Sequence, residues 1–172
     1  MRKLFYLFLI VMVVLSSCGY KLPEENRDEY VIRVAKEGSP EEMKKILKNY
    51  PEYKEKKLNK YWYTVLHFAA EEGSPEMIQA MYESGMDINF CRDVVFYNTP
   101  LERAYYADNY ETMNKLLECG ADPYVVKPHT GKSLASLIKM DPDLVQYVHQ
   151  LSDKTHQRML EAISEAKDGS SK

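Results

Sequence analysis

The chain has 172 residues, which is enough for one domain once any targeting segment is removed. Its 28% charged and 45% hydrophobic residues are ordinary for a globular protein, and its formal net charge is −3. Because no long block of like charges is present, the composition argues against a nucleic-acid partner.

The first 18 residues have the layout of a secretory signal. Residues 2–3 are basic, and an unbroken apolar run follows over residues 4–15. A transmembrane helix needs about 20 apolar residues, so this run is too short to span a bilayer comfortably. Small residues at 16–17 then precede Cys18, as at the cleavage site of a signal peptide.

The letters LSSC at 15–18 resemble the bacterial lipobox, in which a peptidase cuts directly before an obligatory cysteine. The resemblance implies a lipoprotein signal peptide over 1–17 and a membrane anchor on Cys18, where several acyl chains hold a protein stably. An ordinary signal peptide with a stray cysteine is the alternative. In Gram-negative lipoproteins an aspartate after the cysteine usually causes retention in the inner membrane. Gly19 stands there instead, so we expect an envelope protein on the periplasmic face of the outer membrane.

A repeat of 35 residues follows a predicted tether at 18–29. The stretch TVLHFAAEEGSPEMIQAMYESGMD at 64–87 matches TPLERAYYADNYETMNKLLECGADP at 99–123 in threonine, leucine, alanine, glycine and aspartate positions. Another 35 residues upstream, VIRVAKEGSPEEMKKIL at 31–47 carries the same Ala and Gly-Ser-Pro-Glu positions. A more degenerate fourth unit lies at 131–151.

This pattern resembles the ankyrin repeat, whose signature begins T-P-L-H-x-A-A-x-x-G and ends L-L-x-x-G-A-D. The resemblance implies an all-α solenoid of helix-turn-helix repeats joined by β-hairpin-like fingers. We expect a repeat domain over 30–166 and a disordered tail over 167–172. The expected units are about 30–63, 64–98, 99–132 and 133–151, with a capping helix after the last.

Local chemistry agrees with these units. Threonine is a favourable helix cap at 64 and 99, proline suits the first helical turn at 100, and glycine suits a left-handed helix end. We expect small alanines between first helices, and apolar pairs facing the shared core. The residues concerned are Thr64, Thr99, Pro100, Gly85, Gly120, Ala69, Ala70, Ala104, Ile46, Leu47, Met81, Tyr82, Leu116 and Leu117.

No motif indicates catalysis, a metal or a cofactor. The four histidines make no H-x-x-x-H pair, and GKS at 131–133 lacks the upstream glycine of a phosphate-binding loop. His67 occupies the histidine of the T-P-L-H signature, which usually bonds the backbone of an adjacent turn. Cys91 and Cys119 either form a disulfide in an oxidising compartment or remain two buried thiols, the reading that we favour.

Ankyrin proteins bind partners mainly through finger tips and first helices. Here the fingers end in aromatic triplets at 61–63 and 96–98, with Trp62 and Tyr97 where the family normally has glycine. Such aromatic residues either form interface hot spots or fill a thin core. Acidic residues near this face favour a basic or mixed-charge partner. The candidate partner-binding residues are Tyr61, Trp62, Tyr63, Glu71, Glu72, Phe96, Tyr97 and Tyr106.

Small ankyrin lipoproteins resemble immunity proteins that bacteria make against secreted antibacterial effectors, often lipid-degrading enzymes. We therefore expect a monomeric, membrane-anchored protein that is not an enzyme and that binds and blocks a folded toxin. The alternative is an accessory scaffold for a periplasmic enzyme such as a catalase. A host-directed effector is a third interpretation, which the lipobox disfavours.

Overall fold

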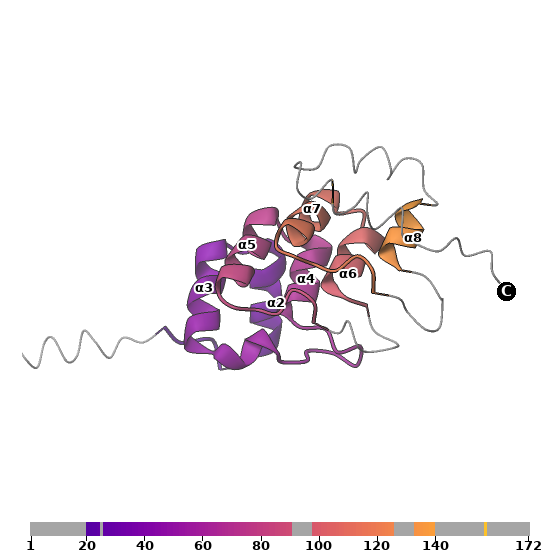
Figure 1. Ribbon diagram of the computed structural model, residues 1–172. Coiled ribbons are helices and arrows are strands. Elements are labelled where there is room, and N and C mark those ends of the chain that lie inside the picture. Colours follow the sequence, from indigo (N-terminus) through magenta and orange to yellow (C-terminus); the bar gives the residue numbers. More distant parts are fainter. Residues whose placement is uncertain (1–19, 25, 91–97, 126–132, 140–156, 158–172) are drawn as a thin grey trace, which may run out of the picture.

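The computed structural model describes residues 20–24, 26–90, 98–125, 133–139 and 157 (Figure 1). The predicted signal peptide and almost all of the predicted capping helix and tail lie outside this part of the chain, as do Cys18, Cys91, Phe96 and Tyr97. Among the described residues, no helix has both the length and the apolar character needed to cross a membrane.

Three helix pairs follow one another along the chain. The first helices, α2, α4 and α6, contact one another in order, and the second helices, α3, α5 and α7, form a row beside them (Figure 1). The described elements are all helical, as predicted. They are α2 (Arg27–Glu37), α3 (Pro40–Asn49), the 3-10 helix η1 (Pro51–Lys54), α4 (Val65–Glu72), α5 (Pro75–Glu83), α6 (Pro100–Tyr106), α7 (Tyr110–Glu118) and α8 (Leu134–Lys139).

Helix ends lie where the sequence predicts them. The Thr99 hydroxyl accepts a hydrogen bond from the Glu102 N–H at 3.2 Å, and the Glu102 carboxylate accepts one from the Thr99 N–H at 2.7 Å. This reciprocal cap, with Pro100 in the first turn, begins α6. Gly85 and Gly120 adopt left-handed backbone conformations, with φ of 81° and 96°. The predicted roles of these residues are therefore confirmed.

Neighbouring repeats approach closely through their smallest residues. A Cβ added to Gly73 would lie 2.8 Å from the carbonyl oxygen of Ala35 in the preceding repeat. The Gly73 carbonyl in turn accepts a hydrogen bond from the Thr112 hydroxyl of the following repeat at 3.2 Å. The alanines predicted between first helices, Ala69, Ala70 and Ala104, are all fully buried.

The prediction that Tyr82 faces the core is wrong. Tyr82 is 46% exposed, whereas its neighbour Met81 is fully buried. Leu47 and Leu117 stand at the equivalent place in the other two repeats, and both are buried. A tyrosine is larger than a leucine and carries a hydroxyl that gains from contact with water, so the ring stays at the surface.

A second prediction to be corrected is the tether at 18–29. Part of this segment packs on the first repeat. Leu22 is only 4% exposed, and its N–H donates to the Tyr50 hydroxyl at 3.0 Å. The Tyr20 hydroxyl donates to the Glu42 carboxylate of α3 at 3.3 Å. Tyr20 and Leu22 therefore belong to the folded body.

Candidate partner-binding surface

The finger that precedes α4 is a tight turn built around Asn59. The Asn59 backbone carbonyl accepts a hydrogen bond from the Trp62 N–H at 3.1 Å. Its side-chain oxygen accepts two more, from the N–H groups of Tyr61 at 2.9 Å and Tyr63 at 3.1 Å. The Leu58 N–H closes the finger by donating to the Tyr63 carbonyl at 2.7 Å. One asparagine thus organises the backbone that carries all three aromatic side chains.

Trp62 has a backbone conformation that normally belongs to glycine. Its φ is 63°, in the left-handed region, where a residue with a Cβ pays about 1–2 kcal/mol. The finger therefore keeps the backbone turn of a glycine although a tryptophan occupies the position. The indole is 37% exposed, and the Lys57 ammonium lies 3.1 Å from its ring centroid.

The other two finger aromatics have different environments. The Tyr63 ring stacks on His67 at 4.9 Å between centroids, and the Arg103 guanidinium lies 5.2 Å from the Tyr63 centroid. These ring contacts make Tyr63 part of the packing, and burial raises the pKa of its hydroxyl. Tyr61 is 50% exposed, with the Lys60 ammonium 5.0 Å from its ring centroid. The predicted triplet thus contains surface residues and a packing residue.

His67 links two consecutive repeats. Its Nδ1 accepts a hydrogen bond from the Thr64 N–H at 3.1 Å, so the ring proton of the neutral imidazole lies on Nε2. Nε2 is 3.1 Å from the Asn98 carbonyl oxygen, to which it donates. The side chain is fully buried, and these bonds confirm the predicted structural role of the histidine.

The adjacent carboxylates Glu71 and Glu72 diverge from α4 toward opposite neighbours. Glu72 forms an ion pair with Lys36 of α2 at 2.5 Å, and Glu71 forms one with Arg103 of α6. Both carboxylates were predicted to contact a partner. In the structure each of them already binds a basic group one repeat away.

Tyr106, at the end of α6, is an exposed residue among those predicted on first helices. It is 53% exposed, and its ring meets that of Tyr105 edge-on at 5.2 Å between centroids. Together with Tyr61 and Trp62 it gives the described part of the chain three exposed aromatics among the predicted contact residues.

Cys119 is a free thiol, and its sulfur lies 3.9 Å from the Gln79 side-chain oxygen. Burial raises the pKa of the Cys119 thiol, so the thiol remains protonated at neutral pH and is a weak nucleophile. Among the described residues, no cluster of His, Cys, Asp and Glu could hold a metal ion.

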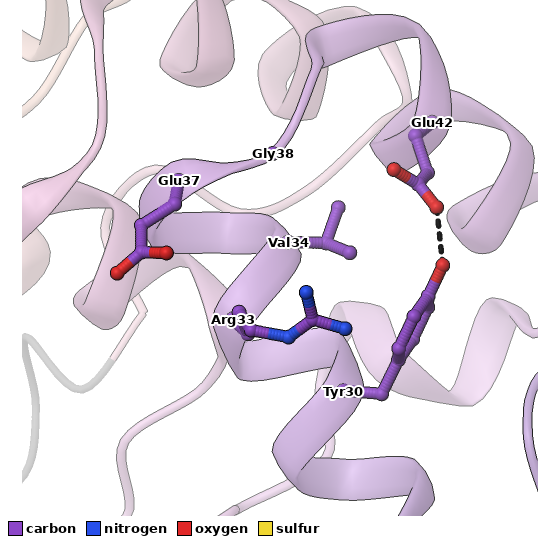
Figure 2. A pocket seen from close by; sticks show the side chains of 6 residues that line it. All are labelled: Tyr30, Arg33, Val34, Glu37, Gly38 and Glu42. Atoms are coloured by element: carbon purple, nitrogen blue, oxygen red, sulfur yellow. Dashed lines mark hydrogen bonds between the residues drawn. The ribbon is translucent and has the colours of Figure 1, made fainter.

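Between α2 and α3 lies a pocket of about 150 Å³ (Figure 2). Glu42 accepts a hydrogen bond from the Tyr30 hydroxyl across it, and the Arg33 guanidinium lies 5.1 Å from the Tyr30 ring centroid. Ligand pockets typically measure roughly 300–1,000 Å³, so this one is small for a ligand. The remaining lining residues are Val34, Glu37 and Gly38.

A family model described as Ankyrin repeats (3 copies) matches residues 30–127, which is more than half of the chain. The chain belongs to the ankyrin-repeat family. The match covers most of α2 and all of α3 to α7, so the predicted ankyrin solenoid is confirmed. Ankyrin repeats are typically modules for protein–protein interaction and not catalysts. No curated protein matches the chain.

Proposed function

We propose that this ankyrin protein is a membrane-anchored inhibitor in the bacterial envelope, which binds and blocks a secreted antibacterial effector such as a lipase. The proposal that the protein binds a partner rests mainly on Trp62. This residue is exposed on a finger and has a strained backbone conformation. Strain of this kind is concentrated at functional sites. Tryptophan and tyrosine also dominate measured interface hot spots. A strained, exposed tryptophan is therefore more readily explained by a partner than by the fold.

The anchor is proposed on Cys18, on the evidence of the lipobox-like sequence before it. Because Tyr20 already contacts α3, only Gly19 separates this packed residue from the proposed lipid-bearing Cys18. Two residues of extended chain span at most about 7 Å. An anchored domain would thus lie against the bilayer, and the tether would raise its concentration where an effector arrives.

Inhibition would act by occlusion. Tyr61 and Trp62 project from a finger whose backbone is fixed by Asn59, so they can enter a concave active-site mouth with little ordering cost. The ankyrin stack then needs no catalytic group of its own, because a blocked entrance keeps substrate out.

The test is a pull-down from envelope extract with residues 19–172, which include every described residue, followed by mass spectrometry. We expect a hydrolase that loses activity when the domain is added. The double variant Trp62→Ala with Tyr97→Ala should lose this protein while keeping wild-type helicity and melting temperature. Tyr82→Ala, which removes an exposed aromatic from a second helix, is the matched control and should still bind. A retained enzyme that stays active would overturn inhibition and indicate a scaffold.

A further inference from the structure

The segment 54–63, which ends in the finger before α4, has a net charge of opposite sign to that of the rest of the chain. Residues 54–63 contain four lysines and one glutamate, in a chain whose net charge is −3. Lys56 forms an ion pair within the fold, because its ammonium binds the Asp28 carboxylate at 2.6 Å. Lys57 and Lys60 instead lie over the rings of Trp62 and Tyr61 and pair with no carboxylate of the described residues.

The acidic side chains of the neighbouring first helix are neutralised within the chain. Glu72 pairs with Lys36, and Glu71 pairs with Arg103, whose side chain is only 19% exposed. The expectation of a basic or mixed-charge partner rested on acidic residues near this face. Since the charge of both carboxylates is already matched, the charges that lie directly over the exposed rings of Tyr61 and Trp62 are positive.

We propose that Lys57, Lys60, Tyr61 and Trp62 together recognise an acidic, partly apolar patch on a folded protein. The proposal rests on the proposed binding function and adds the chemistry of the partner surface. A cation above an aromatic ring gains about 0.5–1 kcal/mol at an exposed site, so each ammonium is held in place before binding. Pre-positioning of this kind lowers the entropy that binding would otherwise cost.

Each group of this surface has a distinct part in recognition. An ammonium has three N–H donors, and a ring beneath it leaves donors available to partner carboxylates. The indole of Trp62 and the phenol of Tyr61 supply apolar contact area. Opposite charges also accelerate encounter, which makes the association rate depend on salt. We therefore expect both a salt-sensitive on-rate and an apolar anchor.

A matched pair of charge reversals tests the proposal. Lys57→Glu with Lys60→Glu reverses the finger, and Lys45→Glu with Lys48→Glu makes the same charge change at exposed positions of α3. The probe is the envelope protein that the wild-type domain retains, purified and passed over each immobilised domain. We expect the finger reversal to weaken binding at least about tenfold, and the control to change it by less than about twofold.

Three further measurements test whether the finger recognises an acidic patch. Raising the ionic strength from about 0.05 M to about 0.5 M should slow association with the wild type much more than with the finger reversal. Lys57→Met with Lys60→Met, which keeps the apolar stems, should fold as the wild type does and weaken binding in the same direction. Reversing an acidic patch of the retained protein to lysine should restore binding to the reversed finger. Equal binding by wild type and reversed finger would overturn this proposal and leave the proposed function standing, whereas a wild type that retains nothing would overturn both.

A membrane surface is the competing occupant, because lysine, tyrosine and tryptophan also gather at bilayer interfaces. The test uses the unlipidated domain and vesicles of roughly three parts phosphatidylethanolamine to one part phosphatidylglycerol. We expect no sedimentation with these vesicles. Sedimentation that the finger reversal abolishes would identify the finger as a lipid contact and overturn recognition of an acidic protein.

Discussion

Replacing Trp62 by glycine and by alanine separates backbone strain from side-chain loss. Both variants remove the indole and its contact with Lys57, so their difference reports only the backbone at a φ of 63°. Alanine keeps the left-handed cost of about 1–2 kcal/mol. Glycine avoids that cost but gives the unfolded chain more freedom, worth about 0.4–1 kcal/mol. We expect Trp62→Gly to be more stable than Trp62→Ala by about 0.5–1 kcal/mol.

Thermal unfolding followed by far-ultraviolet circular dichroism measures this difference. In a chain of this size about 1 kcal/mol moves Tm by roughly 2–4 °C, which two matched variants resolve. An alanine variant as stable as the glycine variant would refute the left-handed conformation at position 62. Affinity gives the second readout, since loss of a hot-spot tryptophan costs about 2 kcal/mol or more, roughly 30-fold. Unchanged affinity with reduced stability in both variants would assign the indole to packing.

Three other predictions concern the finger, the repeat contact and an ion pair. Asn59→Ala removes the acceptor of two finger N–H groups and should lower the free energy of unfolding by about 1–2 kcal/mol in urea titrations, whereas Asn59→Asp should keep it. Gly73→Ala places a Cβ 2.6 Å from the Ala69 carbonyl oxygen and 2.8 Å from that of Ala35, and should cost about 1–3 kcal/mol, so an unchanged urea midpoint would contradict this close packing. Burial alone would raise the pKa of Asp28, but hydrogen bonds, first that from Lys56, outweigh it and lower the pKa below its ordinary value. Its stabilisation is therefore present above the ordinary pKa of about 3.9 and is lost as pH falls through the lower folded value. Asp28→Asn should accordingly destabilise the protein at neutral pH, and its melting temperature should approach that of the wild type in acid.

The helix ends could be predicted because their signals are local. The cap at Thr99 and the left-handed turn at Gly120 depend on residues within one helical turn, and the repeat spacing places them. The packed segment before α2 could not be predicted in this way. Leu22 stands alone between Lys21 and Pro23, so it contributes to no apolar periodicity. Its burial depends on the Tyr50 hydroxyl and the surface around it, which exist only in the fold.

The ion pairs between repeats were missed although the sequence contains a signal for them. Lys36 and Glu72 are 36 residues apart, close to the 35-residue offset of the repeats. Glu71 and Arg103 also stand on consecutive first helices, α4 and α6, but at a separation of 32 residues. Within α4 alone these carboxylates have no basic partner, whereas the stacking of first helices brings a basic side chain of the neighbouring repeat to each of them.

The pairing of charges between repeats has a consequence for recognition. A repeat stack joins its units through their first helices, so the charges there are used to hold one unit to the next. Lys57 and Lys60, by the finger before α4, stand outside those contacts, because they lie over the rings of Trp62 and Tyr61 and not over a neighbouring helix. The stability of the stack and the charge of the finger can therefore vary independently. A substitution at Lys57 or Lys60 changes what the finger attracts, whereas one at Glu71 or Arg103 also weakens the stack that positions the finger.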